Sequence, residues 1–183
     1  MMIFITQRLI IRKAVSCDED IDFFYRIWTN PEVVKFVGFP KGLRITKDEI
    51  AEGINRQDDT EYNKKLIVEL KSDKVAIGEC KLGLPDGEGI SETDVKLLPE
   101  YWGKGYGTEI KRGLVDYLFE NTDCISVKAS PNKDNIASQK MQEAVGGIRT
   151  GEGVFEFLSE MKGYTCDVPY YEYRVYRKDW KKK

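Results

Sequence analysis

Three glycines alternate with other residues at Gly103, Gly105 and Gly107, between an expected strand and an expected helix. Because glycine lacks a Cβ, each can take a positive φ and let successive backbone N–H groups converge on one point. The helix that follows would add its unpaired first-turn N–H groups and the positive end of its dipole. This segment therefore predicts a site for an anion such as a diphosphate, with Lys104 adding positive charge.

Periodicity predicts the elements on either side of this loop. The alternation of residues 93–98 indicates a strand, which Pro99 ends because it offers no N–H to a ladder. One apolar stripe predicts a helix over 107–120 and places Lys111 on another face. The stripe recurs at i, i+4, i+7 and i+8 and consists of Ile110, Leu114, Tyr117 and Leu118.

Two better-known glycine loops fit this segment poorly. A dinucleotide fingerprint needs G-x-G-x-x-G, but its last position is Thr108 counting from Gly103 and Ile110 counting from Gly105. A P-loop needs G-x-x-x-x-G-K-[ST], and the chain has no such run. The strand, loop and helix therefore call for another kind of anion site.

The remaining pattern predicts a mixed α/β sheet with mostly antiparallel strands. The expected strands are 8–13, 65–71, 75–84, 93–98, 124–129, 149–158 and 170–177, and the expected helices are 18–29, 46–56, 107–120 and 135–145. With 183 residues, 41% of them hydrophobic, and no linker-like stretch, we expect one domain over 1–183.

Charge and cysteine usage exclude several functional classes. The net charge is −2 and the basic residues are scattered, so no nucleic-acid partner is expected. No apolar stretch approaches the roughly 20 residues of a membrane span, and no secretory signal is recognisable. The four cysteines form no C-x-x-C pair, which indicates reduced thiols, no metal site and a cytoplasmic location.

The segment Trp102–Gly107 resembles the acyl-CoA loop of the GCN5-related N-acetyltransferases (GNAT), [Q/R]-x-x-G-x-[G/A], with Trp102 where Gln or Arg is usual. The longer run 98–109 looks like the RimJ/RimL branch, which acetylates protein N-termini and various small amines. Asn135 and Ser138 match the family's N-x-x-[S/A] at the start of the next helix. Residues 8–12 and 30–37 also resemble the branch, so the similarity spans nearly the whole chain.

The resemblance implies a GNAT fold: a mixed, mostly antiparallel twisted sheet of six to seven strands with about four helices, splayed at its central strands. It implies an N-acetyltransferase that moves the acetyl group of acetyl-CoA directly to a primary amine in a ternary complex. Two alternatives stay open, a non-catalytic acyl-CoA-binding or sensor module and an unrelated nucleotide-phosphate binder. Exposed edge strands near the C-terminus make a homodimer a further expectation.

The resemblance also implies which residues hold the cofactor. The strand before the loop would pair with the pantetheine amides, the loop would grip the diphosphate, and the second motif would lie beside the thioester. The implied residues are Lys96, Leu97, Leu98, Trp102, Gly103, Lys104, Gly105, Tyr106, Gly107, Thr108, Asn135 and Ser138.

Catalytic roles follow from the same resemblance. The backbone N–H of Leu97 would polarise the thioester carbonyl. Many members use a Tyr seven residues after the motif Asn to protonate the departing thiolate; that position is Gln142, so Ser138 becomes the expected hydrogen-bond donor to sulfur. The chain has no histidine, so a carboxylate is the expected base. Glu156 is the nearest match to the branch.

Three other carboxylates stay open as the base, because a shift of one residue would turn Glu156 to the wrong face of its strand. They are Glu79, Glu92 and Asp94. An ordered water between the carboxylate and the amine could also relay the proton.

Overall fold

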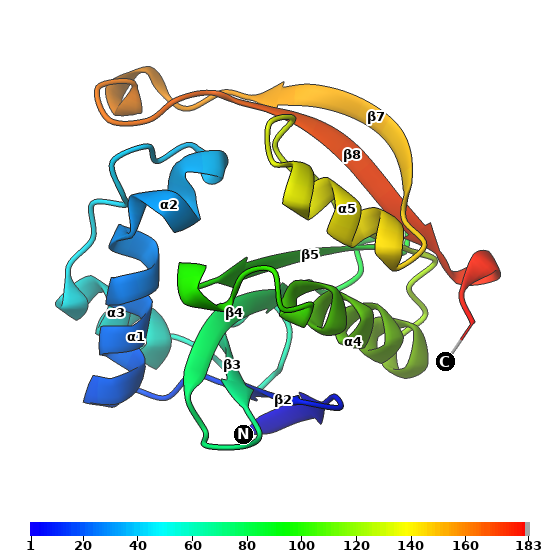
Figure 1. Ribbon diagram of the computed structural model, residues 1–183, viewed down its shortest axis with the longest axis horizontal. Helices are drawn as coiled ribbons and strands as arrows, with labels where there is room; N and C mark the ends of the chain where they lie inside the picture. Colours follow the sequence, from blue (N-terminus) through cyan, green and yellow to red (C-terminus); the bar gives the residue numbers. More distant parts are fainter. Residues whose placement is uncertain (182–183) are drawn as a thin grey trace.

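The computed structural model describes residues 1–181, in which one sheet of eight strands runs in the order β1-β2-β3-β4-β5-β6-β8-β7 (Figure 1). Every neighbouring pair is antiparallel except β5 and β6. The mixed, mostly antiparallel sheet expected from the sequence is thereby confirmed. The strands are β1 Met2–Ile5, β2 Leu9–Lys13, β3 Leu66–Leu70, β4 Ala76–Leu82, β5 Ile90–Leu97, β6 Ser126–Ala129, β7 Ile148–Phe155 and β8 Val168–Tyr176.

Five α-helices accompany the sheet within the described residues. Four were expected, and the fifth is the single turn α2, where Pro31 takes the first helical position and the Asn30 side chain accepts from the Glu32 N–H. Short 3-10 turns complete the chain, including η1 Lys35–Val37 and η2 Pro99–Tyr101. The helices are α1 Asp18–Thr29, α2 Pro31–Val34, α3 Lys47–Asn55, α4 Tyr106–Asn121 and α5 Ile136–Ala144.

The helices cover opposite faces of the sheet. In β3, Leu66 and Val68 belong to the core formed with α4, whereas Ile67 belongs to the core formed with α1 and α3. This is the alternation of a strand that is buried on both sides. In Figure 1, α1, α2 and α3 lie together in blue and cyan, and α4 and α5 lie together in green and yellow.

The two central strands separate part-way along their length. β5 pairs with β6 only over its first residues, from Ile90 with Ser126 to Glu92 with Lys128. Its later residues, from Thr93 to Leu97, pair with β4 on the other side. β5 and β6 therefore form a fork whose apex lies at Thr93, which is the splay expected from the sequence.

Several strands differ from their sequence predictions; β5, for example, begins at Ile90 and not at residue 93. β1 was not predicted, because four residues carry too little periodicity; its pairing with β2 and the stacking of Phe4 on Tyr117 hold it in place. β7 ends at Phe155 rather than at residue 158. No helix in the described part of the chain is long and apolar enough to cross a membrane. Residues 1–181 also contain no group of side chains suited to bind a metal ion.

Candidate active site

A cavity of about 930 Å³ occupies the fork between β5 and β6. Both Asp94 and Lys96 line it, and so do Thr93, Val95 and Leu97. Because successive side chains of a strand point to opposite faces, a cavity lined by all five passes through the sheet. The α4 and α5 side and the α2 side are therefore connected at this point.

The free edge of β5 is fixed by its hydrogen bonds to β4. Leu98 donates its N–H to the Ile77 carbonyl at 3.0 Å, and Glu92 accepts from the Gly83 N–H at 2.9 Å. In an antiparallel ladder such pairs alternate, so the even-numbered residues of β5 bond to β4 and the odd-numbered ones face the fork. The backbone of Leu97 thus faces the cavity, whereas the N–H groups of Lys96 and Leu98 belong to the ladder.

This register decides which of the three β5 residues expected to contact the cofactor can do so through their backbone. Leu97 fits its predicted role as a donor at the fork, and its carbonyl accepts from the Trp102 indole at 2.8 Å. Leu98 does not fit, because its N–H is already used and its side chain is buried in the core. Lys96 contributes its side chain to the cavity wall.

The glycine loop has the predicted backbone form at two of its three glycines. Gly103 has φ 72° and Gly105 has φ 80°, both left-handed. Gly105 is the N-cap of α4, and no side chain in the described part of the chain caps this helix. The first-turn N–H groups of α4 thus meet the cavity that Gly103, Gly105 and Gly107 line.

Gly107 does not have the positive φ expected from the sequence. It is the second residue of α4 and is helical. Its lack of a side chain serves close packing instead, because a Cβ there would lie 3.1 Å from Met141 Sδ and 3.8 Å from Leu97 Cδ1. Gly107 thus lets α4 approach α5 and β5 at the cavity.

The other loop residues divide between the cavity and the outer surface. Trp102, Tyr106 and Thr108 line the cavity. Lys104 is not among the lining residues, and its ammonium lies 5.4 Å from the centre of the Tyr101 ring. Lys104 therefore faces outward at the mouth of the loop.

Arg8 is a neighbour of this loop that the sequence did not reveal as part of the site. Its guanidinium donates to the Lys104 carbonyl at 3.1 Å and lies 4.3 Å from the centre of the Tyr106 ring. Its other side donates to Glu109 at 2.7 Å. Arg8 therefore holds the outer side of the loop, which links β2 to α4. A lone arginine at a strand start carries no pattern that predicts this contact.

The start of α5 is built around the Asn135 and Ser138 pair. Asn135 is the N-cap, and its side-chain oxygen accepts from the Ser138 N–H at 3.1 Å. Both residues line the cavity. The Ser138 hydroxyl makes no hydrogen bond within residues 1–181, so it is available to a ligand.

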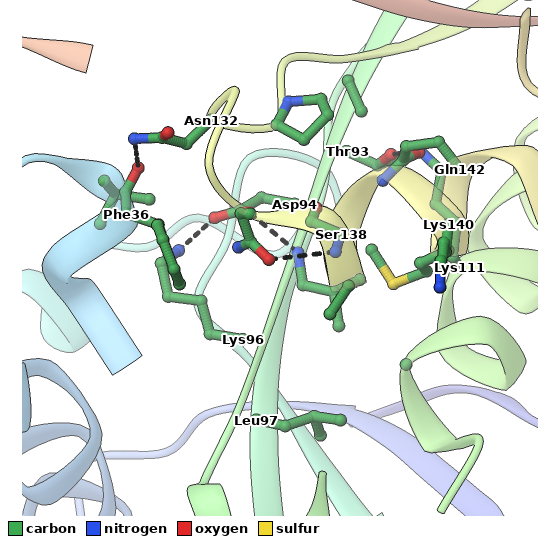
Figure 2. A pocket seen from close by; sticks show the side chains of 18 of the residues that line it. Phe36, Thr93, Asp94, Lys96, Leu97, Lys111, Asn132, Ser138, Lys140 and Gln142 are labelled. Carbon is green, nitrogen blue, oxygen red and sulfur yellow. Dashed lines mark hydrogen bonds and ion pairs between the residues drawn. The ribbon is translucent and has the colours of Figure 1, made fainter. Parts of the chain in front are cut away.

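Asn132 closes one side of the cavity. Its side-chain amide donates to the Phe36 carbonyl at 3.2 Å, a contact that ties the segment before α5 to η1 (Figure 2). Phe36, Glu32 and Tyr170 line the cavity on the α2 side. The two halves of the molecule therefore meet across the site.

Glu156, the expected base, lies outside the cavity. It is exposed and follows the last residue of β7, whereas its neighbour Phe155 is among the lining residues. Alternation along an extended chain turns adjacent side chains apart, so Phe155 takes the inward position and Glu156 the outward one. The structure therefore does not bring Glu156 together with Ser138 and Leu97.

Asp94 and Glu79 are two carboxylates that share Lys96 as an ion-pair partner. Asp94 lines the cavity and forms an ion pair with Lys96, which also lies 3.3 Å from Glu79 (Figure 2). Burial would raise the pKa of Asp94, but Lys96 and the Val95 N–H outweigh it and the pKa is lowered. Glu79 is buried and accepts from the Trp28 indole at 2.7 Å.

Glu92 is held by two lysines. Its carboxylate lies 3.1 Å from Lys81 and 3.4 Å from Lys128. Burial acts to raise its pKa, yet the two ammonium groups lower it below the usual value. Glu92 lies within the last β5–β6 pair, opposite Lys128, whereas Asp94 lies beyond that pair, so Asp94 is the better placed of the two beside the fork.

Lys111 lies in the cavity, although the sequence pattern placed it on another face of its helix than the apolar stripe. Its side chain is 1% exposed, lines the cavity and donates to the Thr93 hydroxyl. Burial lowers its pKa to about 7, against an opposing effect of Asp94 and Glu92. A signal was present, because residue 111 stands three, four and seven positions before Leu114, Val115 and Leu118 on the buried arc of α4.

Comparison with known proteins gives one match to a family model. The model described as "Acetyltransferase (GNAT) domain" matches residues 8–148. Among curated proteins, the uncharacterized N-acetyltransferase p20 of Bacillus licheniformis is 28% identical over 166 residues, which is 89% of this chain and 90% of that protein.

Solved structures show the same fold. An acetyltransferase of the GNAT family from Bacillus anthracis matches with TM-score 0.77 and 22% identity, covering 98% of this chain and 100% of that chain. The spermidine N-acetyltransferase from Vibrio cholerae in complex with CoA and spermine matches with TM-score 0.75 and 19% identity, covering 93% and 96%. At these identities the likeness concerns the fold.

Proposed function

The chain belongs to the GNAT acetyltransferase family, and we propose that it transfers the acetyl group of acetyl-CoA to a primary amine in a ternary complex. The amine is a protein N-terminal α-amino group or a small amine. One observation carries the proposal: the glycine turn, the free edge of β5 and the start of α5 line a single cavity that passes through the sheet. Donor and acceptor can thus approach the same point from opposite faces.

The residues present fit coenzyme A. Gly103 and Gly105 in left-handed conformations and the uncapped first turn of α4 offer N–H groups to the diphosphate. Leu97 offers its backbone at the fork to the extended arm, beside Asn135 and Ser138. When bound, acetyl-CoA supplies an activated acyl group at the sulfur end of this arm, and the Leu97 N–H would bind the arm itself.

The acceptor enters from the α2 side in this proposal. Glu32, Phe36 and Tyr170 line that side, and Asp94 lies next to the fork. We assign Asp94, in place of Glu156, as the carboxylate that takes a proton from the amine, directly or through a water. The spermidine N-acetyltransferase relative is described with spermine, and a polyamine is accordingly one class of acceptor to test.

Finer assignments belong to the same proposal. Membership of the RimJ/RimL branch rests on the amino-acid sequence of residues 98–109. A cytoplasmic location is proposed because all four cysteines are free thiols. A homodimer would use β7, which lies at one edge of the sheet and exposes Ile148, Val154 and Phe155.

One observation favours a second candidate, a CoA-binding module without catalysis. Gln142 occupies the position where many relatives carry the tyrosine that protonates sulfur, and an amide has no useful acidity. Such a module would bind CoA with the same turn but would release no thiol.

Two measurements separate the candidates. Thermal unfolding with CoA, acetyl-CoA, ATP or NAD tests the binding site, and we expect stabilisation by the two CoA species only. A thiol-release assay with N-terminal peptides, polyamines and aminoglycosides then tests transfer. Thiol release above background with any acceptor supports the enzyme. Binding without release across the panel would support the module, and stabilisation by ATP or NAD alone would reject both.

A further inference from the structure

Lys111 is a buried amine for which the acetyl transfer described above has no role. It extends from α4 to the Thr93 hydroxyl on β5 and is 1% exposed. Burying a lysine without a carboxylate partner is costly, since neither Asp94 nor Glu92 makes an ion pair with it. A methionine or leucine would fill the same space without that cost, so the amine calls for a function.

The position of the amine along β5 matters. Thr93 is the first residue after the last pair between β5 and β6, so the Lys111 ammonium lies at the apex of the fork. From Leu97 to Thr93 is four residues, about 13 Å of strand. The arm of coenzyme A has about a dozen chain atoms between diphosphate and sulfur, comparable to four residues of extended backbone. The sulfur end would thus reach the region of the apex.

Two other polar residues that line the cavity cannot supply the proton. Ser138 carries an aliphatic hydroxyl, which can donate a hydrogen bond but is far too weak an acid to give up its proton. Gln142 is buried and lines the cavity, and its amide is equally unable to protonate a thiolate. Lys111 is an ammonium that lines the same cavity as Ser138 and Gln142 and lies at the apex (Figure 2).

We propose that the Lys111 ammonium donates the proton to the sulfur of coenzyme A as the thiol leaves. The proposal rests on the transferase function proposed above and assigns its acid catalyst. As the carbon–sulfur bond breaks, the sulfur keeps the bonding electron pair and takes a proton from Nζ. Lys111 is left as a neutral amine and recovers a proton from solvent. The acceptor nitrogen forms the new bond to the acyl carbon and loses its own proton to Asp94 or water.

The electrostatic surroundings suit this role. Burial lowers the pKa of Lys111 to about 7, while Asp94 and Glu92 on β5 act to raise it. Lys128 on β6 and Lys140 on α5 line the same cavity, but the lowered pKa of Lys111 comes from its burial. An acid with a pKa near the working pH can both donate and recover its proton in each cycle. An ordinary lysine, with a pKa of about 10.4, would hold its proton too tightly.

The test compares Lys111→Met with Lys178→Met. Methionine fills the buried space with an apolar chain of similar length, so the fold and CoA binding should persist. Lys178→Met is the matched control, because it removes an exposed ammonium that lies outside the cavity. With an acceptor that the wild type uses, we expect Lys111→Met to lower kcat by about 10²-fold or more while the KM for acetyl-CoA changes little. Lys178→Met should keep kcat within a few-fold.

A readout without turnover uses bound CoA itself. A protonated Lys111 beside the sulfur stabilises the thiolate, so the thiol of CoA bound to the wild type should titrate at lower pH than that of CoA bound to Lys111→Met. Ultraviolet absorbance of the thiolate across a pH series measures this difference. The Lys178→Met complex should titrate like the wild type.

The outcomes distinguish the inference from the function on which it rests. If the wild type releases thiol, but Lys111→Met matches its kcat and its bound CoA titrates unchanged, the acid role is wrong and the transferase stands. Acetylation of Lys111, found by peptide mass analysis after incubation with acetyl-CoA, would make it an acyl acceptor and overturn the role. A wild type that binds CoA and releases no thiol with any acceptor would reject the transferase, while the thiol titration still tests the ammonium at the sulfur.

Discussion

At the scale of single residues, replacing the carboxylate of Asp94 should slow acetyl transfer and leave the binding of CoA unchanged. In Asp94→Asn the side chain can still accept from Lys96, so the packing at the fork is kept, but the proton acceptor is gone. We expect kcat to fall by about 10²-fold with little change in the thermal shift given by CoA. Steady-state kinetics with the best acceptor from the panel measures the effect.

Glu156→Gln is the matched control for Asp94, because Glu156 is exposed and lies outside the cavity. Its kinetics should equal those of the wild type. A large loss in Glu156→Gln together with a silent Asp94→Asn would reverse the assignment of the base. Because the pKa of Asp94 is lowered, any loss of rate between pH 8 and 6 should follow the protonation of the acceptor amine and not that of Asp94.

At the scale of elements, the sequence predicted the positions of the helices well and the directions of individual side chains poorly. The helix 18–29 was predicted with the bounds it has, because its apolar positions recur at the helical period. Glu156 was misplaced because β7 ends one residue before it, which a period of two does not reveal. Lys111 was misplaced because a charged residue on the edge of an apolar stripe is usually solvated, and only the packing of α4 on β5 buries it.

The glycines of the loop should respond differently to substitution because they serve different needs. At Gly103 a Cβ meets nothing within 4 Å, so Gly103→Ala costs only the left-handed backbone, about 1 kcal/mol of stability. At Gly107 a Cβ meets Met141, and the branches of Gly107→Val would push α4 from α5 and close the cavity. Calorimetric titration with CoA should show weak binding for Gly107→Val and a smaller loss for Gly103→Ala. Equal losses would contradict this division of roles.

Glu109, in the first turn of α4, accepts hydrogen bonds from the turn before β2. These bonds should make the stability of the fold depend on pH. Glu109 accepts from the Thr6 hydroxyl at 2.6 Å and from the Arg8 backbone at 2.7 Å. Burial opposes ionisation, but these bonds and the Arg8 charge lower its pKa. A lowered pKa contributes stability that is present above the unfolded value, about 4.3, and is lost as the pH falls through the folded value.

Glu109→Gln should therefore be less stable than the wild type at pH 7, by about 1 kcal/mol once the exposure of Arg8 is allowed for. The gap should narrow as the pH is lowered from 5 to 3, because protonation removes the same charge from the wild type. Urea unfolding at each pH gives the two curves. A gap that stays constant with pH would show that the charge of Glu109 contributes nothing.

At the scale of the whole molecule, the cavity joins elements from both halves of the chain, which ties ligand binding to global unfolding. Asn132 reaches Phe36, Arg8 reaches the Lys104 carbonyl, and the sheet runs unbroken from β1 to β7. A chain built in this way should unfold in one transition over residues 1–183, as expected for a single domain. Two resolved transitions in calorimetry would instead indicate two units.

A ligand held by that shared cavity stabilises the whole fold and not one part of it. At a CoA concentration one hundred times its Kd, the free energy of unfolding should rise by about 2.7 kcal/mol. Because CoA binds the folded state alone, the single unfolding transition should move to higher temperature without splitting. Asn132→Ala removes the bond to Phe36 but leaves the glycine turn, so CoA should still shift its transition. A shift of only one of two transitions would mean that the cavity does not couple the two halves.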